Sequence, residues 1–208
     1  MTPQQRRSKI TPERELELFE AVVELLKEGG YSALTMEGVA ARSRCGKSTL
    51  YRQWGTKPLL VAAALRGTRR VRLGDIDTGT LEGDLRAAVR AGADRAGRDT
   101  ALVHAVSHAA LHNPELLRAL REALMEPEIA AVDAMVERAV TRGELAPGNP
   151  AAEFLAVQLL GVLRARPTME GRYADEAYLT RFLEAVVLPG LGLRTRTPGP
   201  DPDDGPHP

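Results

Sequence analysis

The chain is poor in cysteine and in aromatic residues. Its single cysteine, Cys45, excludes an intramolecular disulfide and a metal site built from several cysteines, so nothing in the sequence points to an oxidising compartment. Aromatic residues make up 4% of the sequence, while alanine and leucine are abundant. This balance disfavours sheets, which are enriched in aromatic and β-branched residues. We therefore expect an all-α protein in the cytoplasm.

A long apolar run is also missing. The longest, from Phe154 to Leu163, contains Gln158 and is about half of the roughly 20 residues that a membrane-spanning helix needs. The first ten residues are polar and basic, and they lack the apolar stretch of a signal peptide. The sequence thus predicts neither a membrane span nor secretion.

Net charge is absent over the whole chain, but the charges are distributed unevenly. Residues 1–72 hold 14 Lys and Arg against 7 Asp and Glu, whereas residues 73–208 hold 14 against 21. A basic N-terminal part on an acidic remainder suggests that the N-terminal part alone meets a polyanion. Simple solvation of these charges is an equally good interpretation of the charge pattern by itself.

Capping residues and helical spacing predict four helices in the basic part. Thr11 can cap a helix that begins at Pro12, and Gly29-Gly30 ends its apolar pattern. Thr35 caps a short helix over 36–42, Ser43-Arg44-Cys45-Gly46 forms a tight turn, and a third helix covers 47–54. A fourth covers about 58–70. Two short helices joined by a four-residue turn are typical of a helix-turn-helix, whose second helix can enter the major groove of DNA.

The remainder of the chain also has helical spacing. We expect helices at about 81–97, 100–112, 114–142, 150–165 and 175–188, with a kink or break at Pro127. The predicted domains are a flexible basic arm (1–10), a helix-turn-helix domain (11–57), a connecting helix (58–72), a helical ligand-binding and dimerisation domain (73–194) and a disordered tail (195–208).

The helix over 47–54 has one apolar and one polar face. Leu50 and Trp54 lie four residues apart and can face the core with Met36, Val39 and Ala40. The polar face would present Lys47, Ser48, Tyr51 and Arg52 outward. Lys47 and Ser48 come first in the helix, where such helices approach base edges and where the helix dipole favours phosphate.

Residues 11–62 resemble the N-terminal domain of the TetR family of transcriptional regulators. The resemblance is carried by Gly30-Tyr31, Leu34-Thr35, Val39-Ala40, Thr49-Leu50-Tyr51, Trp54, Lys57 and Leu60. It implies that Thr35 contacts a phosphate, that Thr49, Tyr51 and Lys57 grip the DNA backbone, and that Lys47 and Ser48 read bases, with Tyr51 contributing. Together with the outward-facing residues, the predicted DNA-binding set is Thr35, Arg44, Lys47, Ser48, Thr49, Tyr51, Arg52, Gln53 and Lys57.

The turn departs from the pattern of that family. Ser43-Arg44-Cys45-Gly46 stands where the family has Ala-Gly-Val-Ser, so Arg44 occupies the usual glycine position. Unless the turn is rearranged, Arg44 needs a left-handed backbone, which costs a non-glycine residue roughly 1 kcal/mol. A phosphate contact by Arg44 would offset this cost. Gln53 replaces a histidine and keeps a hydrogen-bonding group, and we expect the Cys45 thiol to be buried.

The resemblance also implies a homodimer formed by the last two helices and a small ligand bound in the helical body. The apolar residues predicted at the interface are Phe154, Leu155, Leu159, Val162, Tyr178, Phe182, Leu183 and Val186. The alternative is that these stripes close the interior of the monomer. The residues suggested for the ligand pocket are His104, His108, Met125 and Met135.

His104, His108 and His112 share one helix face, but the outer two lie about 12 Å apart along a helix that rises 1.5 Å per residue. One metal ion cannot bridge them, and we expect no metal and no other cofactor. The expected function is a DNA-binding regulator, a repressor released by a small molecule. The alternatives are a regulator without a ligand and, more remotely, a helical-bundle enzyme, for which no catalytic constellation is visible.

Overall fold

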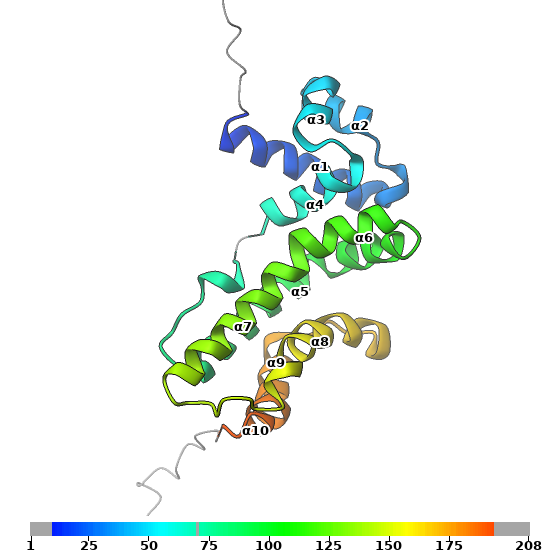
Figure 1. Cartoon of the computed structure of the whole chain (residues 1–208). Coiled ribbons are helices and arrows are strands. Elements are labelled where there is room, and N and C mark those ends of the chain that lie inside the picture. The colour runs from blue at the N-terminus through cyan, green and yellow to red at the C-terminus, as the bar shows by residue number, and fades with distance from the viewer. Residues whose placement is uncertain (1–9, 70, 194–208) are drawn as a thin grey trace, which may run out of the picture. The chain divides into compact units, whose positions relative to one another are not determined.

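The computed structural model describes residues 10–69 and 71–193, except for the side chains of residues 95–101, 103–105 and 168. The predicted arm up to residue 9 and the predicted tail from residue 195 lie outside the described residues. Helices are the regular elements of the described ranges, which contain no strand, so the all-α prediction is confirmed (Figure 1). The elements are α1 (Pro12–Ala33), α2 (Met36–Arg42), α3 (Lys47–Trp54), α4 (Lys57–Gly67), η1 (Leu73–Asp75), α5 (Leu81–Leu111), α6 (Pro114–Leu120), η2 (Arg121–Met125), α7 (Glu126–Thr141), η3 (Ala152–Phe154), α8 (Leu155–Glu170), α9 (Glu176–Phe182), η4 (Leu183–Val187) and α10 (Leu188–Gly190).

The chain forms two compact units. Unit 1 comprises the described part of Met1–Asp75 together with Arg98–Ala131, and unit 2 comprises Ile76–Gly97 together with the described part of Val132–Pro208. Unit 1 contains α1 to α4 and also α6 and η2, which come much later in the sequence. The predicted division into a helix-turn-helix domain, a connecting helix and a ligand-binding domain is a functional one and stays a prediction. Among the described helices, none combines the length and apolar character needed to cross a membrane.

The first helix begins where the sequence predicts. It runs to Ala33, beyond its predicted end at Gly29-Gly30, where its helical geometry is interrupted. The Thr11 hydroxyl accepts a hydrogen bond from the Arg14 amide at 3.3 Å, and Pro12 occupies the first helical position. Gly30 has φ 71° and ψ −179°, which interrupts the helical geometry inside α1. Glycine adopts this positive φ without the clash that a Cβ atom would cause.

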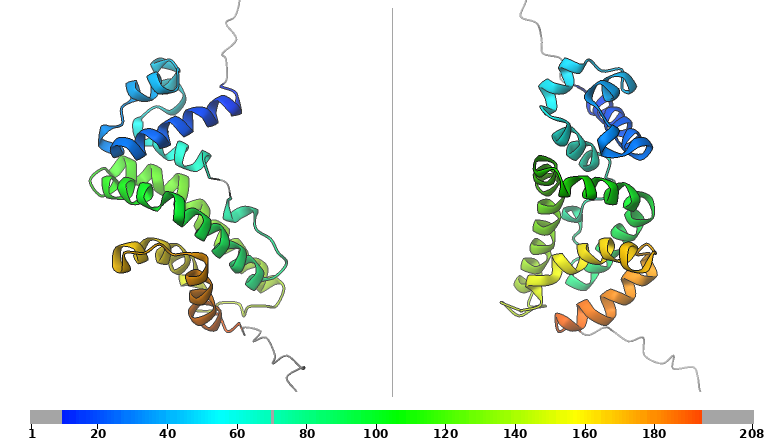
Figure 2. Two further views of the ribbon diagram at one scale, coloured as in Figure 1. Left: turned by 180° about the vertical axis from the view of Figure 1, so that it is seen from behind. Right: turned by 90° about the vertical axis from the view of Figure 1, so that its right-hand side faces the viewer.

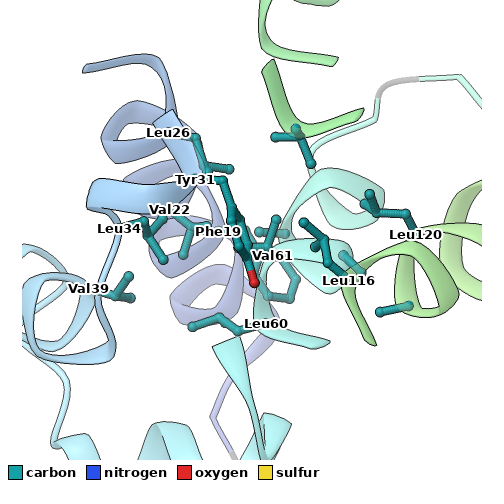
Figure 3. Packing of buried hydrophobic residues seen from close by; sticks show 14 of the residues in the cluster. Phe19, Val22, Leu26, Tyr31, Leu34, Val39, Leu60, Val61, Leu116 and Leu120 are labelled. Carbon is teal, nitrogen blue, oxygen red and sulfur yellow. The ribbon is translucent and has the colours of Figure 1, made fainter. Parts of the chain in front are cut away.

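The core of unit 1 is built from side chains of α1 to α6 and η2. Figure 3 shows part of it, with labelled residues from α1, α2, α4 and α6. Val22 of α1, Leu60 of α4 and Leu116 of α6 are each fully buried. Burying such aliphatic side chains contributes about 1.5–3 kcal/mol each. Gly67 is required near the end of α4, because a Cβ atom there would lie 2.4 Å from the Phe19 ring. Helices α1 and α4 pack closely together, and α2 and α3 pack against this pair.

Two predictions about the later helices have opposite outcomes. A break was expected at Arg98-Asp99, but α5 continues through it to Leu111, so that prediction is wrong. Neither residue lacks an amide hydrogen or blocks the preceding carbonyl, and nothing local therefore ends the helix. The expected irregularity at Pro127 is confirmed: the chain forms a π-helical turn over Arg121–Met125 just before it. A widened turn accommodates the proline, which cannot donate to the carbonyl four residues earlier.

Unit 2 contains a buried carboxylate next to an arginine. Asp84 in α5 is fully buried and accepts hydrogen bonds from the amide of Thr78 at 2.6 Å and from its hydroxyl at 2.8 Å. The Arg138 guanidinium of α7 lies 3.0 Å from the same carboxylate. Burial by itself would raise the pKa of Asp84, but the Thr78 and Arg138 contacts lower it below its ordinary value. These contacts fix the loop before α5 against α7.

Candidate nucleic-acid interface

The two short helices α2 and α3 lie at the end of unit 1 that is farthest from α6 (Figures 1 and 2). Both have the predicted bounds, Met36–Arg42 and Lys47–Trp54. Thr35 caps α2 as expected, because its hydroxyl accepts a hydrogen bond from the Gly38 amide at 3.0 Å. Thr35 is exposed, so its hydroxyl hydrogen is available for a partner outside the chain.

The turn between them is a helix C-cap with a left-handed residue. The Arg44 amide donates to the Ala41 carbonyl at 3.3 Å and the Cys45 amide donates to the Ala40 carbonyl at 3.0 Å. This pair of bonds defines a Schellman arrangement, which places a left-handed residue directly after the helix cap. That residue is Arg44, with φ 50°, and it is the one non-glycine with positive φ among the described residues. The prediction of a left-handed Arg44 is therefore confirmed. Cys45 is partly rather than fully buried.

Helix α3 packs one face on the core and leaves the other exposed. Leu50 is fully buried, and Trp54 packs on the core edge-to-face with the Phe19 ring, with 5.7 Å between ring centroids. Thr49 is half-buried. The exposed face carries Lys47, Ser48, Tyr51, Arg52 and Gln53. The apolar and polar faces of α3 are thus divided as the sequence predicts.

The first turn of α3 combines a cation with free backbone donors. Its N-cap is Gly46, which supplies no side-chain hydrogen bond to the first amides. The Lys47 ammonium forms an ion pair with Glu37 of α2 and lies 5.7 Å from the centre of the Tyr51 ring. The hydrogen bond between Lys47 and Glu37 raises the pKa of Lys47 and lowers that of Glu37. Lys47 therefore stays charged, and an incoming phosphate or base has to compete with Glu37.

Lys57 lies differently from its predicted role. Its ammonium donates to the carbonyl oxygens of Tyr31 at 3.0 Å and of Leu34 at 2.9 Å, and it lies 4.1 Å from the centre of the Tyr31 ring. Burial lowers the pKa of Lys57. The ammonium joins the first turn of α4 to the segment between α1 and α2. The structure thus gives Lys57 an internal structural role, and its grip on the DNA backbone stays a prediction.

Two arginines that support α2 and the turn were missed by the sequence reasoning. The Arg14 guanidinium donates to the carbonyl oxygens of Ser43 and Arg44 and pairs with Glu17. Arg42 pairs with Glu28 at 2.8 Å. Arg14 and the turn are 29 and 30 residues apart in sequence, and no local pattern connects them.

The residues predicted at the dimer interface fall into two groups. Leu155, Leu159 and Leu183 are buried within the single chain, and their contact with a partner subunit stays a prediction. Apolar spacing alone does not distinguish a stripe that faces the monomer interior from one that faces a partner. Phe154 and Val186 are about half exposed, and the side chains of Val162, Tyr178 and Phe182 are partly buried. For these five residues the interface stays a prediction. Val157 on α8, which was not among the predicted residues, is 69% exposed.

The predicted pocket residues are divided between the two units. Met135 is fully buried in unit 2, whereas His108 is exposed and Met125 packs on the core of unit 1. The side chain of His104 lies outside the described residues. A cleft of about 480 Å³ opens in unit 1, and its lining includes Phe19, Trp54, Arg66 and Arg72 rather than the predicted residues.

His108 and His112 contact each other edge-to-face, with ring centroids 5.7 Å apart. Within the described side chains no group of three His, Cys, Asp or Glu residues is arranged to hold a metal ion. The expectation that the chain binds no metal stays a prediction.

Known proteins with related sequences are transcriptional regulators. Residues 18–64 match the family of bacterial regulatory proteins called the tetR family, and residues 75–186 match the tetracyclin repressor-like C-terminal domain. An HTH-type transcriptional regulator of Mycobacterium tuberculosis, Rv1556, is 32% identical over 88% of this chain and 90% of its own length. The DNA-binding transcriptional repressor TetR of Mycobacteroides abscessus is 30% identical over 84% of this chain and 92% of its own length.

The fold has a close counterpart among solved structures. The crystal structure of the TetR family transcription regulator SCO0332 superposes with a TM-score of 0.70 and 28% identity over 86% of this chain and 98% of that chain. These relatives are transcriptional regulators, and the one from Mycobacteroides abscessus is a DNA-binding repressor. Both halves of the chain match one family, and α2, the turn and α3 have the geometry of a helix-turn-helix with an exposed polar recognition face. The chain belongs to the TetR family of transcriptional regulators.

Proposed function

We propose that the protein is a homodimeric repressor that binds duplex DNA through α3 and is released from its operator by a small molecule. The observation that best supports DNA binding is that α3 has one face buried on the core and one exposed polar face. Buried Leu50 and packed Trp54 hold the helix on the core, while Lys47, Ser48, Tyr51 and Arg52 face outward. The repressor of Mycobacteroides abscessus, 30% identical to this chain, supports the sign of the regulation.

The exposed groups of α3 suit two kinds of DNA contact. Lys47 and Ser48 belong to the first turn, where a recognition helix meets base edges, and they would read the sequence. Thr35, Thr49, Tyr51 and Gln53 carry hydroxyl or amide groups that suit phosphate oxygens and would fix the register. Arg44 and Arg52 add positive charge. Each phosphate neutralised by a cation makes binding more dependent on salt.

Dimerisation follows from the geometry of duplex DNA. One α3 reads a single half-site, and two half-sites about one helical turn apart require two recognition helices. The exposed apolar residues Phe154, Val157 and Val186 lie in η3, in α8 and in η4, respectively. Such residues suit a two-fold interface in which two helices of each subunit take part.

An effector would act by preferring one arrangement of α4 over another. In the family that this chain belongs to, the helical C-terminal part binds the ligand. A ligand that binds one arrangement more tightly changes the spacing of the two α3 helices and hence the affinity for DNA.

The proposal that the protein binds specific DNA is tested by fluorescence anisotropy with a labelled duplex from the region upstream of the protein's own gene. We expect tighter binding to this duplex than to a scrambled duplex of equal composition, and affinity that falls steeply as salt rises. Equal affinity for both duplexes at every salt concentration contradicts the proposal.

The effector is tested by thermal shift against a metabolite panel, because a ligand that binds the folded state alone raises the melting temperature. Each hit is then added to the protein–DNA complex, and a true effector lowers the anisotropy. Trp54 is the single tryptophan of the chain and lines the cleft of unit 1, so quenching of its fluorescence reports a ligand bound there. A panel with no hit favours the regulator without a ligand.

A further inference from the structure

The turn that directs α3 contains an arginine in a conformation that glycine normally supplies. Arg44 has φ 50°, and its carbonyl follows the end of α2, where the last carbonyls of a helix lack amide partners within the helix. The Ser43 hydroxyl donates a hydrogen bond to the Val39 carbonyl at 2.7 Å, so it stabilises the end of α2 and not the turn itself. A left-handed arginine persists when the surrounding structure restrains it.

The restraint comes from α1. The Arg14 guanidinium donates to the Ser43 carbonyl oxygen and lies 3.4 Å from the Arg44 carbonyl oxygen through the same nitrogen. A cation at the C-terminal end of a helix also interacts favourably with the helix dipole. Arg14 thus occupies the place where the positive charge and the hydrogen-bond donors of a guanidinium stabilise this turn most.

Arg14 is itself held in place. Its amide donates to the capping Thr11 hydroxyl at 3.3 Å, and its guanidinium pairs with Glu17 one turn further along α1. These contacts connect the first turn of α1 to the turn between α2 and α3. The direction in which α3 leaves the turn depends on the backbone angles of Arg44 and its neighbours.

We propose that Arg14 is a positioning residue for DNA recognition: it stabilises the left-handed conformation of Arg44 and so fixes α3 at the angle needed for reading the operator. Arg14 acts through the turn and contacts no base. This inference rests on the proposed DNA-binding function of α3. According to this proposal, the side chain of Arg14 in α1 offsets the conformational cost of a left-handed backbone at Arg44.

The test is a double-mutant cycle between Arg14 and the turn. Arg14→Ala is combined with Arg44→Gly, which relieves the left-handed strain, and with Arg44→Ala, which removes the guanidinium but keeps the strain. Arg118→Ala, an exposed arginine on α6, is the control for the loss of one positive charge. Affinity for the upstream duplex and for the scrambled duplex is measured for each variant.

We expect Arg14→Ala to lower the preference for the upstream duplex about tenfold, with a smaller effect on the scrambled duplex. The loss should persist in the Arg44→Ala background and largely disappear in the Arg44→Gly background. If Arg14→Ala weakens both duplexes equally and does so in every background, Arg14 is a phosphate contact and the proposal is overturned.

A second measurement needs no DNA. The Cys45 amide, bonded to the Ala40 carbonyl at 3.0 Å, is a direct probe of the turn. Hydrogen exchange of this amide in free Arg14→Ala protein should be about fivefold or more faster, and Arg44→Gly should restore the slow exchange. Unchanged exchange overturns the positioning role even if the protein binds DNA. Faster exchange in a protein that discriminates no duplex supports the role in the turn and contradicts the proposed function.

Discussion

The residues of the exposed α3 face differ in how free they are to meet DNA. Lys47 is paired with Glu37 in the free protein, so the proposed contact with a base would replace an existing ion pair. Tyr51 is 45% exposed, and its only described ring contact is with Lys47. In the proposed complex, the phenol hydroxyl would therefore reach DNA at little cost in rearrangement. Mutation of Tyr51 is correspondingly the cleaner test of the interface.

Tyr51→Phe should weaken binding to the upstream duplex about fivefold, which corresponds to roughly 1 kcal/mol for a hydrogen bond to phosphate. The midpoint of thermal unfolding should not change, because the hydroxyl is at the surface. Tyr173→Phe is the matched control, since Tyr173 is 49% exposed but lies outside unit 1. The DNA affinities of the two variants are measured by anisotropy titration. Equal affinities would show that the Tyr51 hydroxyl does not contact DNA.

Lys57→Met tests whether this lysine grips DNA or holds unit 1 together. The change keeps most of the aliphatic chain but leaves the carbonyls of Tyr31 and Leu34 without their donor. We expect a loss of about 1–3 kcal/mol in the free energy of unfolding, measured by urea denaturation. The salt dependence of DNA binding should stay as in the wild type. An unchanged stability with a shallower salt dependence would identify Lys57 as a phosphate contact instead.

At the scale of elements, the irregular segments carry specific tasks. The π-helical turn over Arg121–Met125 carries the chain past Pro127, and two of its residues line the cleft of unit 1. The loop before α5 is held by buried Asp84, which accepts hydrogen bonds from Thr78 and Arg138. The attachment of this loop therefore depends on the Asp84 carboxylate, whose protonation can be changed with pH.

Asp84→Asn should lower the free energy of unfolding at neutral pH by roughly 3 kcal/mol, because the Arg138 guanidinium loses its buried counter-ion. The folded-state pKa of Asp84 lies below its ordinary value of about 3.9. Its contribution is therefore fully present above about pH 4 and is lost as the pH falls through the folded-state pKa.

Urea midpoints measured between pH 7 and pH 2.5 test this linkage. The wild type should lose more stability than Asp84→Asn on acidification, so the two curves should converge at low pH. Parallel curves would show that Asp84 does not titrate differently in the folded and unfolded states. Glu82→Gln, on the same first turn of α5 but partly exposed, serves as the control.

For the whole molecule, the proposed homodimer is the property to test. Val157 of α8 is 69% exposed, and we propose that it contacts the partner subunit. Val157→Asp should convert a dimer into a monomer and weaken DNA binding by at least about tenfold at equal subunit concentration, because a single α3 holds one half-site. Size-exclusion chromatography with light scattering measures the mass. Leu111→Asp, which changes a 74% exposed leucine outside α8 and α9, should leave mass and affinity unchanged.

Local patterns predicted the helix-turn-helix closely. Thr35 as a cap, the four-residue turn and the spacing of Leu50 and Trp54 are properties of adjacent residues, so the bounds of α2 and α3 could be read without the rest of the chain. For Arg44 the sequence left two alternatives, a left-handed backbone or a rearranged turn, and the structure shows the left-handed one.

The remaining features were decided by residues far apart in sequence. Arg14 reaches the turn, and Lys57 reaches the carbonyls of Tyr31 and Leu34, only once α1, α2 and α4 are packed. The stripe containing Leu155, Leu159 and Leu183 shows that these leucines are buried, but its periodicity is the same whether another part of the chain or a second subunit buries them.

The sequence by itself determined the fold class and the exposed face of α3, because these follow from helix periodicity, capping and short-range spacing. It also indicated the family, through the resemblance carried by residues 11–62. The tertiary structure decided how α3 is held, which leucines close the monomer and where the Lys57 ammonium lies. Each of these features depends on which elements pack against each other. Contacts between residues far apart in sequence leave no pattern among neighbouring residues from which they could be predicted.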